Sequence, residues 1–231
     1  MNEIGITERG DAALEFSWLP WVRDGNPAIL ITKDPARLFR ELLVRKEESA
    51  KFNVIIHATI TGLGGSIFEP KVPDKATSLK GYKDLIQFYS ADRVVLRIDP
   101  IIPNDSGIRI AKKVLAEKQG RVRISFIDQY PHTKARFKEA GIILPWGTFH
   151  APIELRKKAY EKLGQPDICG EPDFECTGCI SEKDCVILGV APKEISGAQR
   201  KFCACLANKK ELLKDKDQCP HACLYCYWGK P

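Results

Sequence analysis

The sequence predicts an α/β fold: a parallel β/α, TIM-like partial barrel of six or seven strands with a cysteine-rich C-terminal extension. Two observations support this fold class. Short, continuously apolar runs alternate with amphipathic stretches over residues 1–164, and all nine cysteines lie at or after Cys169. Strands that are apolar along their whole length are typical of parallel sheets buried on both faces.

The strongest strands are predicted at 28–32, 52–61, 93–100 and 121–128, and weaker ones at 3–7, at 141–144 and near 168. Helices are predicted at 77–90, 108–118 and 151–163. Another begins after residue 33, where Asp34 is the expected N-cap and Pro35 the first helical residue. His57, in the middle of a strand, is expected to be a hydrogen-bonded core residue.

Six or seven strand-helix units are fewer than the eight of a closed TIM barrel. A partial barrel is therefore favoured, with an open doubly wound sheet as the alternative. The composition changes at about residue 164, where a loop-rich region of Cys, Gly, Pro and charged residues begins. We expect residues 1–164 to form the barrel core and residues 165–231 to form a metal-binding extension that docks on the barrel rim.

Polar side chains follow the predicted strands at their carboxyl ends, where the active sites of parallel α/β folds gather. We expect them to meet on one rim. They are Arg9, Asp11, Thr61, Glu69, Arg97, Asp99, Asp128 and Tyr130.

Charge and hydropathy limit the classes of partner and location. Residues 1–164 hold 27 Lys and Arg against 20 Asp and Glu, so the predicted barrel is mildly basic and suits an anionic substrate such as a nucleotide or nucleic acid. No uncharged apolar run approaches the ~20 residues that a membrane-crossing helix requires. The first residues lack the apolar core of a secretory signal, so the expected location is the cytoplasm.

The cysteines carry the chemistry that the sequence predicts. An odd number of cysteines in a reducing compartment favours metal ligation or redox chemistry over disulfides. Cys219, Cys223 and Cys226 have the spacing C-x3-C-x2-C. Three thiolates on a tight loop can hold three irons of a 4Fe-4S cluster and leave the fourth iron open, whereas such clusters normally have four cysteine ligands. Zinc is the alternative, with His221 as a fourth ligand.

The C-x3-C-x2-C motif, with Tyr225 just before its third cysteine, resembles the cluster motif of radical S-adenosylmethionine (SAM) enzymes. Nearly the whole chain resembles a radical-SAM-like family of unknown function that has this cluster at its C-terminus. The segments 59–62, 69–70, 97–100, 125–128 and 199–205 carry that resemblance. It implies that SAM binds the open iron and that an electron donor such as a ferredoxin or flavodoxin reduces the cluster.

A second metal site is also predicted, either an auxiliary Fe-S cluster or zinc. The family resemblance implies Cys169, Cys179, Cys203 and Cys205 as its ligands. Local spacing instead favours Cys176 together with Cys179. Both alternatives stay open at this point.

The first functional hypothesis is thus an enzyme that cleaves SAM reductively to begin radical chemistry on an unknown substrate. Arg97, Asp99 and Asp128 are its candidate catalytic residues, and Arg9, Thr61, Glu69 and Tyr225 its candidate cofactor-binding residues. The alternative is a non-catalytic binding or electron-transfer module that zinc or an Fe-S cluster stabilises.

Overall fold

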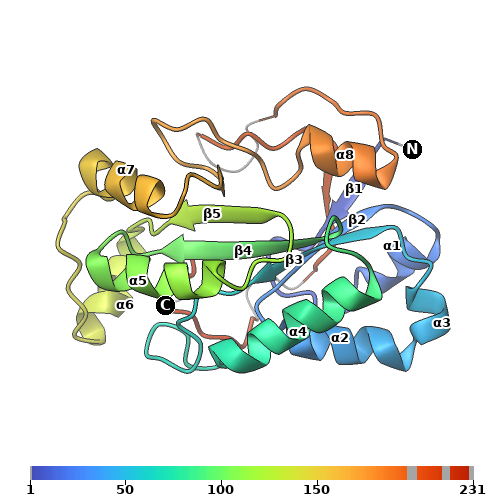
Figure 1. The fold of residues 1–231 in the computed structure, drawn as a ribbon, viewed down its shortest axis with the longest axis horizontal. Coiled ribbons are helices and arrows are strands. Elements are labelled where there is room, and N and C mark those ends of the chain that lie inside the picture. The colour runs from blue at the N-terminus through green and yellow to red at the C-terminus, as the bar shows by residue number, and fades with distance from the viewer. Residues whose placement is uncertain (1, 197–201, 215–218, 229–231) are drawn as a thin grey trace.

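Seven parallel strands form one sheet in the computed structural model, which describes residues 2–196, 202–214 and 219–228. The order across the sheet is β6-β5-β4-β3-β2-β1-β7. Figure 1 labels β1 to β5 of this series. The strands are β1 (Ile4–Ile6), β2 (Ala28–Thr32), β3 (Val54–Thr59), β4 (Val94–Ile101), β5 (Val122–Phe126), β6 (Asp167–Ile168) and β7 (Lys209–Glu211).

From β1 to β6, each strand lies beside the next one along the chain, which is the strand order of a TIM barrel. The order does not reverse as it would in a doubly wound sheet. The sheet curls into a half-barrel whose two outer strands are β6 and β7. The predicted α/β class and partial barrel are therefore confirmed.

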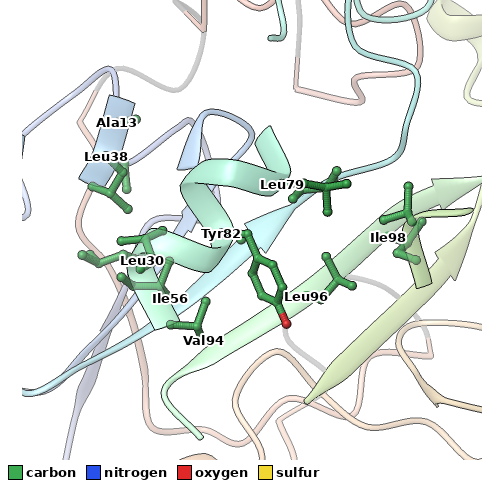
Figure 2. Packing of buried hydrophobic residues seen from close by; sticks show 14 of the residues in the cluster. Ala13, Leu30, Leu38, Ile56, Leu79, Tyr82, Val94, Leu96 and Ile98 are labelled. Carbon is green, nitrogen blue, oxygen red and sulfur yellow. The ribbon is translucent and has the colours of Figure 1, made fainter. Parts of the chain in front are cut away.

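Eight helices accompany this sheet in the described residues: α1 (Leu19–Arg23), α2 (Pro35–Val44), α3 (Lys46–Ser49), α4 (Lys75–Phe88), α5 (Asp105–Leu115), α6 (Pro131–Glu139), α7 (Ile153–Lys162) and α8 (Glu182–Leu188). Helices α2, α4 and α5 cover the outer face of the sheet, whereas α8 lies against the inner face, where its Cys185 and Leu188 pack with Ile29 and Ile55. Leu38 of α2 and Tyr82 of α4 pack with Leu30, Ile56 and Leu96 of the strands in the largest hydrophobic cluster (Figure 2). The Asp34 side chain accepts a hydrogen bond from the Arg37 N–H, which confirms the predicted start of α2.

The inner face of the sheet is covered by the cysteine-rich segment. Ile29, Ile55 and Val95 alternate with the outward-facing residues of their strands and pack against Ile180 and Leu206. Both faces of the central strands are buried, as their continuous hydrophobicity predicts. The segment after residue 165 also supplies β6 and β7. The division at residue 164 stays a prediction.

Several elements differ from the sequence-based expectation. The strand predicted at 141–144 is wrong: these residues form a turn and loop after α6. Ile142 and Leu144 pack in a small cluster while Ile143 is exposed. The apolar residues are therefore explained by a loop whose alternate side chains pack against the protein. The helices α1, α3, α6 and α8 and the strand β7 were not predicted. Strand β7 reads Lys-Lys-Glu and has no apolar signature. No helix in the described part of the chain is both long and apolar enough to cross a membrane.

Close packing of α4 against α2 makes Gly81 a test of this architecture. A Cβ atom there would overlap the Ala36 backbone and lie 2.6 Å from the Pro35 carbonyl carbon. Gly81→Ala is therefore expected to lower the free energy of unfolding by about 1–3 kcal/mol, although alanine is the better helix former. The control is Gly147→Ala, whose Cβ would meet nothing within 4 Å. Urea unfolding measures the free energy of unfolding of both variants. Equal values for the two variants would contradict this packing.

Candidate functional site

A cavity of about 500 Å³ lies at the carboxyl edge of the half-barrel strands. Residues of β2 to β5, and residues that follow β1, β2 and β5, line one part of it, and the C-terminal segment lines the other. The cavity walls include many of the residues predicted for the rim and the cluster, namely Arg9, Asp11, Arg97, Asp99, Asp128, Tyr130, Cys219, Cys223, Tyr225 and Cys226. Side chains from distant parts of the chain thus meet at the carboxyl edge of the sheet.

His221 anchors the cysteine loop to the start of the barrel. Its Nε2 lies 2.7 Å from Asp11 Oδ2, and its Nδ1 lies 3.3 Å from the Lys71 carbonyl oxygen. Asp11 also accepts hydrogen bonds from the Thr32 hydroxyl and the Lys33 N–H. Both partners of the ring are acceptors, so both ring nitrogens donate. His221 thus has no lone pair to offer a metal ion, which disfavours a zinc site closed by this histidine.

The charge of Asp11 stabilises this imidazolium. Burial alone would lower the pKa of His221, but the hydrogen bond and the charge of Asp11 raise it above its ordinary value. The pair is buried, so the negative charge of Asp11 acts strongly on the imidazole and favours its protonated form.

Tyr225 fixes the other end of the loop through a buried network. Lys33 Nζ donates to the Tyr225 hydroxyl at 2.7 Å and to Glu69 Oε1 at 2.9 Å. The Tyr225 hydroxyl also donates to Glu69 Oε1, and the Thr61 hydroxyl donates to Glu69 Oε2 at 2.6 Å. Burial would raise the pKa of Glu69, but Lys33 and the two hydroxyls lower it. Thr61 and Glu69 lie behind Tyr225 and outside the cavity wall.

Two residues in this site were missed by sequence reasoning. Lys33 directly follows β2, so the search for polar residues after strands, which selected Arg9 after β1, could have found it. Arg136 belongs to the unpredicted helix α6 and donates to the backbone carbonyl oxygens of Cys223 and Cys226. It therefore positions the last part of the cysteine loop.

The three thiols of the loop face the cavity from partly or fully buried positions. Burial raises the pKa of Cys219 to about 11 and that of Cys223 to about 12, and in both cases the neighbouring thiols of the motif add to the effect. A cation that binds here must displace protons, because thiolates and not thiols are metal ligands. As the side chains stand, no group of three or more His, Cys, Asp or Glu in the described residues is arranged to hold a metal ion.

The candidate catalytic residues are paired with neighbouring side chains. Arg97 forms a salt bridge with Asp99, which accepts a hydrogen bond from the Ser125 hydroxyl. Burial would lower the pKa of Arg97, but Asp99 and the nearby cysteines Cys179 and Cys169 raise it, so this guanidinium is a permanent charge. Asp128 contacts His150 Nδ1 at 2.7 Å.

Aromatic rings form another part of the cavity wall. Tyr130 stacks on Tyr227 with a centroid distance of 5.6 Å and an interplanar angle of 22°. The Arg9 guanidinium lies 5.1 Å above the Trp228 ring, within cation-π distance. Flat rings and guanidinium groups at one cavity suit a ligand with a planar heterocycle and an anionic group.

The remaining cysteines lie away from this cavity. Cys169, Cys179 and Cys205 are buried against the inner face of the sheet with Cys203 beside them. Cys176 is bound to the backbone of Glu171, since its sulfur accepts from the Glu171 N–H at 3.2 Å and donates to the Glu171 carbonyl at 3.1 Å. The pairing of Cys176 with Cys179 that local spacing favours stays a prediction.

Comparison with known proteins adds one match. A family model described as a domain of unknown function (DUF1848) matches residues 24–228. A search of curated proteins finds no match.

The buried His57 side chain allows the burial of the inner face of the sheet to be tested. Its expected core position is confirmed, but its expected hydrogen bonds are wrong: neither ring nitrogen has a partner in the described residues. Burial, with Arg123 nearby, lowers the pKa of His57 from 6.5 to about 3. Between these values the unfolded chain binds a proton that the folded chain does not, so stability falls as pH falls.

His57→Leu is expected to remove this dependence, which amounts to as much as about 1.4 kcal/mol per pH unit. Urea unfolding of wild type and variant at several pH values from about 7 to about 5 measures it. Carboxylates titrate in both proteins, so their contribution cancels when the pH slope of one protein is subtracted from that of the other. His132→Leu, at a half-buried histidine of α6, is the control. Equal pH slopes for wild type and His57→Leu would contradict the assignment.

Proposed function

We propose that this chain, which belongs to the DUF1848 family of domains of unknown function, binds a 4Fe-4S cluster through Cys219, Cys223 and Cys226 and cleaves SAM reductively at the open iron. The observation that carries the proposal is the position of the motif: its three thiols line one cavity at the carboxyl edge of a β/α half-barrel. Among the described residues of the cavity wall, no other cysteine is present to complete the cluster.

The donor set and the space fit this cofactor pair. The cavity of about 500 Å³ is within the usual size range for small-ligand sites. When bound and reduced by one electron, the cluster would break the bond between the sulfonium sulfur and the 5′ carbon of SAM, which releases methionine and a radical that takes hydrogen from substrate. A donor such as a ferredoxin or flavodoxin would supply the electron.

The protein's own residues would hold the loop and orient the ligands. Lys33 lies close enough to Cys223 for their charges to interact, so it would offset the negative charge of a thiolate-bound cluster. Tyr225, with Thr61 and Glu69 behind it, would act through Lys33 on the position of the motif. These groups are positioning residues in the proposal.

The charged groups of the cavity complement a zwitterionic ligand. SAM carries an amino group, a carboxylate and a sulfonium. Arg9 and Arg97 would attract the carboxylate, and Asp99 and Asp128 would attract the positive groups. Tyr130 and Tyr227 offer a stacked aromatic surface to an adenine ring or to a nucleotide substrate. The mild basic excess of the barrel region agrees with a nucleotide or nucleic-acid substrate.

Cys223→Ala is the first test. Wild-type protein reconstituted anaerobically with iron and sulfide is expected to be brown, to bleach with dithionite, and to convert SAM to 5′-deoxyadenosine. The variant is expected to lose the 5′-deoxyadenosine product and the cluster of this site, because the remaining two thiols cannot hold it. Cys185→Ser is the control, since Cys185 is buried on α8 and outside the cavity.

The outcomes separate the competing functions. A colourless wild-type protein that retains zinc would support a metal-stabilised binding module and contradict the proposal. A reducible cluster that does not cleave SAM would support an electron-transfer module and contradict the enzymatic part.

Tyr225→Phe tests the positioning network. The variant keeps the ring but removes the hydroxyl that contacts Lys33 and Glu69. Loss of a buried hydrogen-bond partner is expected to cost about 1–3 kcal/mol and to make the cluster break down faster in air. The decay of visible absorbance after exposure to oxygen measures this effect. Tyr160→Phe, outside the cavity wall, is the control; equal decay rates in the two variants would contradict the role of Tyr225.

A further inference from the structure

Four cysteines from three distant segments form a continuous series of contacts inside the half-barrel. Cys169 Sγ lies 3.8 Å from Cys179 Sγ, and the backbone N–H of Cys179 donates to Cys205 Sγ at 3.1 Å. The Cys205 side chain contacts those of both Cys179 and Cys203. These residues belong to the cluster that covers the inner face of the sheet, where Cys169, Cys179 and Cys205 are almost fully buried.

The backbone is shaped to bring these segments together. The Cys169 N–H donates to the Ile124 carbonyl at 2.9 Å, which places Cys169 directly after the edge strand β6. The Leu206 N–H donates to the Ile180 carbonyl at 3.1 Å and joins the other two segments. A Cβ atom on Gly178 would overlap the Ala204 carbonyl and lie 2.5 Å from the Cys205 Cα. Only glycine permits this close approach.

The distance between sulfurs distinguishes one metal ion from a cluster. Four thiolates at ~2.3 Å from one tetrahedral zinc ion lie ~3.8 Å from each other. The observed separation of Cys169 Sγ and Cys179 Sγ is 3.8 Å. In a 4Fe-4S cluster each cysteine binds a different iron, so the cysteine sulfurs stand much farther apart. This one spacing matches a single-ion site. The other side chains would have to turn to complete the site, because no three of these groups in the described residues are yet arranged around a common metal position.

The surroundings also suit an anionic tetrathiolate site. Four thiolates and one zinc ion carry a net charge of −2, and the Arg97 guanidinium lies close enough to Cys169 and Cys179 for their charges to interact. The Cys179 N–H already points at a sulfur, which is the hydrogen bond that a charged thiolate accepts well. The Glu171 backbone already holds the sulfur of Cys176, so this thiol is not among the proposed ligands.

We propose that Cys169, Cys179, Cys203 and Cys205 bind one zinc ion in a tetrahedral site. The ion would tie the segment between β6 and β7 to the inner face of the sheet, and its contribution is structural. None of these four cysteines belongs to the motif that lines the cavity. The zinc site can therefore be tested independently of the proposed SAM chemistry.

A variant without the cavity thiols isolates this site. The full chain with Cys219, Cys223 and Cys226 all changed to Ser is produced in medium that contains both iron and zinc. Elemental and acid-labile sulfide analysis is expected to find one zinc per chain and no sulfide. Cys179→Ser added to this background is expected to abolish zinc binding, whereas Cys176→Ser is expected to retain it. Iron with sulfide in the triple variant, or no bound metal, would overturn the proposal.

Zinc release from otherwise wild-type protein tests the site without removing a ligand. Gly178→Ala is expected to release zinc to a chromogenic chelator about 10-fold faster or more, because it forces the two cysteine segments apart. Gly147→Ala, where the new methyl group meets nothing within 4 Å, is the matched control and is expected to release zinc at the wild-type rate. Equal release rates for the two variants would contradict the assignment.

Discussion

A closed barrel buries its apolar inner face between its own strands, but an open half-barrel leaves that face uncovered. The rest of this structure depends on a segment that covers it. Ile29, Ile55 and Val95 point inward along three adjacent strands. In a closed barrel, strands on the opposite side would fill this space. Here the cysteine-rich segment that follows β6 lies across it and then adds β7 beside β1. The C-terminal part of the chain therefore completes the core of the N-terminal part.

This arrangement explains how a motif at the end of the chain reaches the functional edge of the sheet. Strand β7 pairs in parallel with β1, so the chain leaves it at the same edge as the residues after β1. The loop is then held by two buried charged pairs, His221 with Asp11 and Lys33 with Glu69. The partners are 210 residues apart in the first pair and 36 residues apart in the second. Removal of one partner would leave a buried charge, which is strongly unfavourable.

The sequence predicted the central strands, the start of α2 and most of the rim, because these depend on local patterns: continuous hydrophobicity, a capping Asp34 before Pro35, and polar residues after strands. The elements it missed depend on tertiary contacts. Strand β7 is charged and exists because β1 offers an unpaired edge. The apolar run at 141–144 has the composition of a strand, but it packs as a loop. His57 was placed correctly, yet its lack of hydrogen bonds could not be foreseen, since this depends on which side chains cover the inner face.

The same packing places one set of cysteines on a cavity wall and another set in the apolar interior, and these surroundings constrain their chemistry. Cys219, Cys223 and Cys226 line a cavity large enough for a small ligand, as a cluster with an open coordination position requires. Cys169, Cys179 and Cys205 lie in an apolar interior, which suits a redox-inert ion with all positions filled by protein. Arg97 lines the cavity and also interacts with Cys169 and Cys179. A guanidinium in that position balances the charge of the interior thiolates whether or not it orients a ligand. The loss of activity on replacing Arg97 would therefore not by itself identify it as catalytic, and zinc retention in that variant is the measurement that separates the two roles.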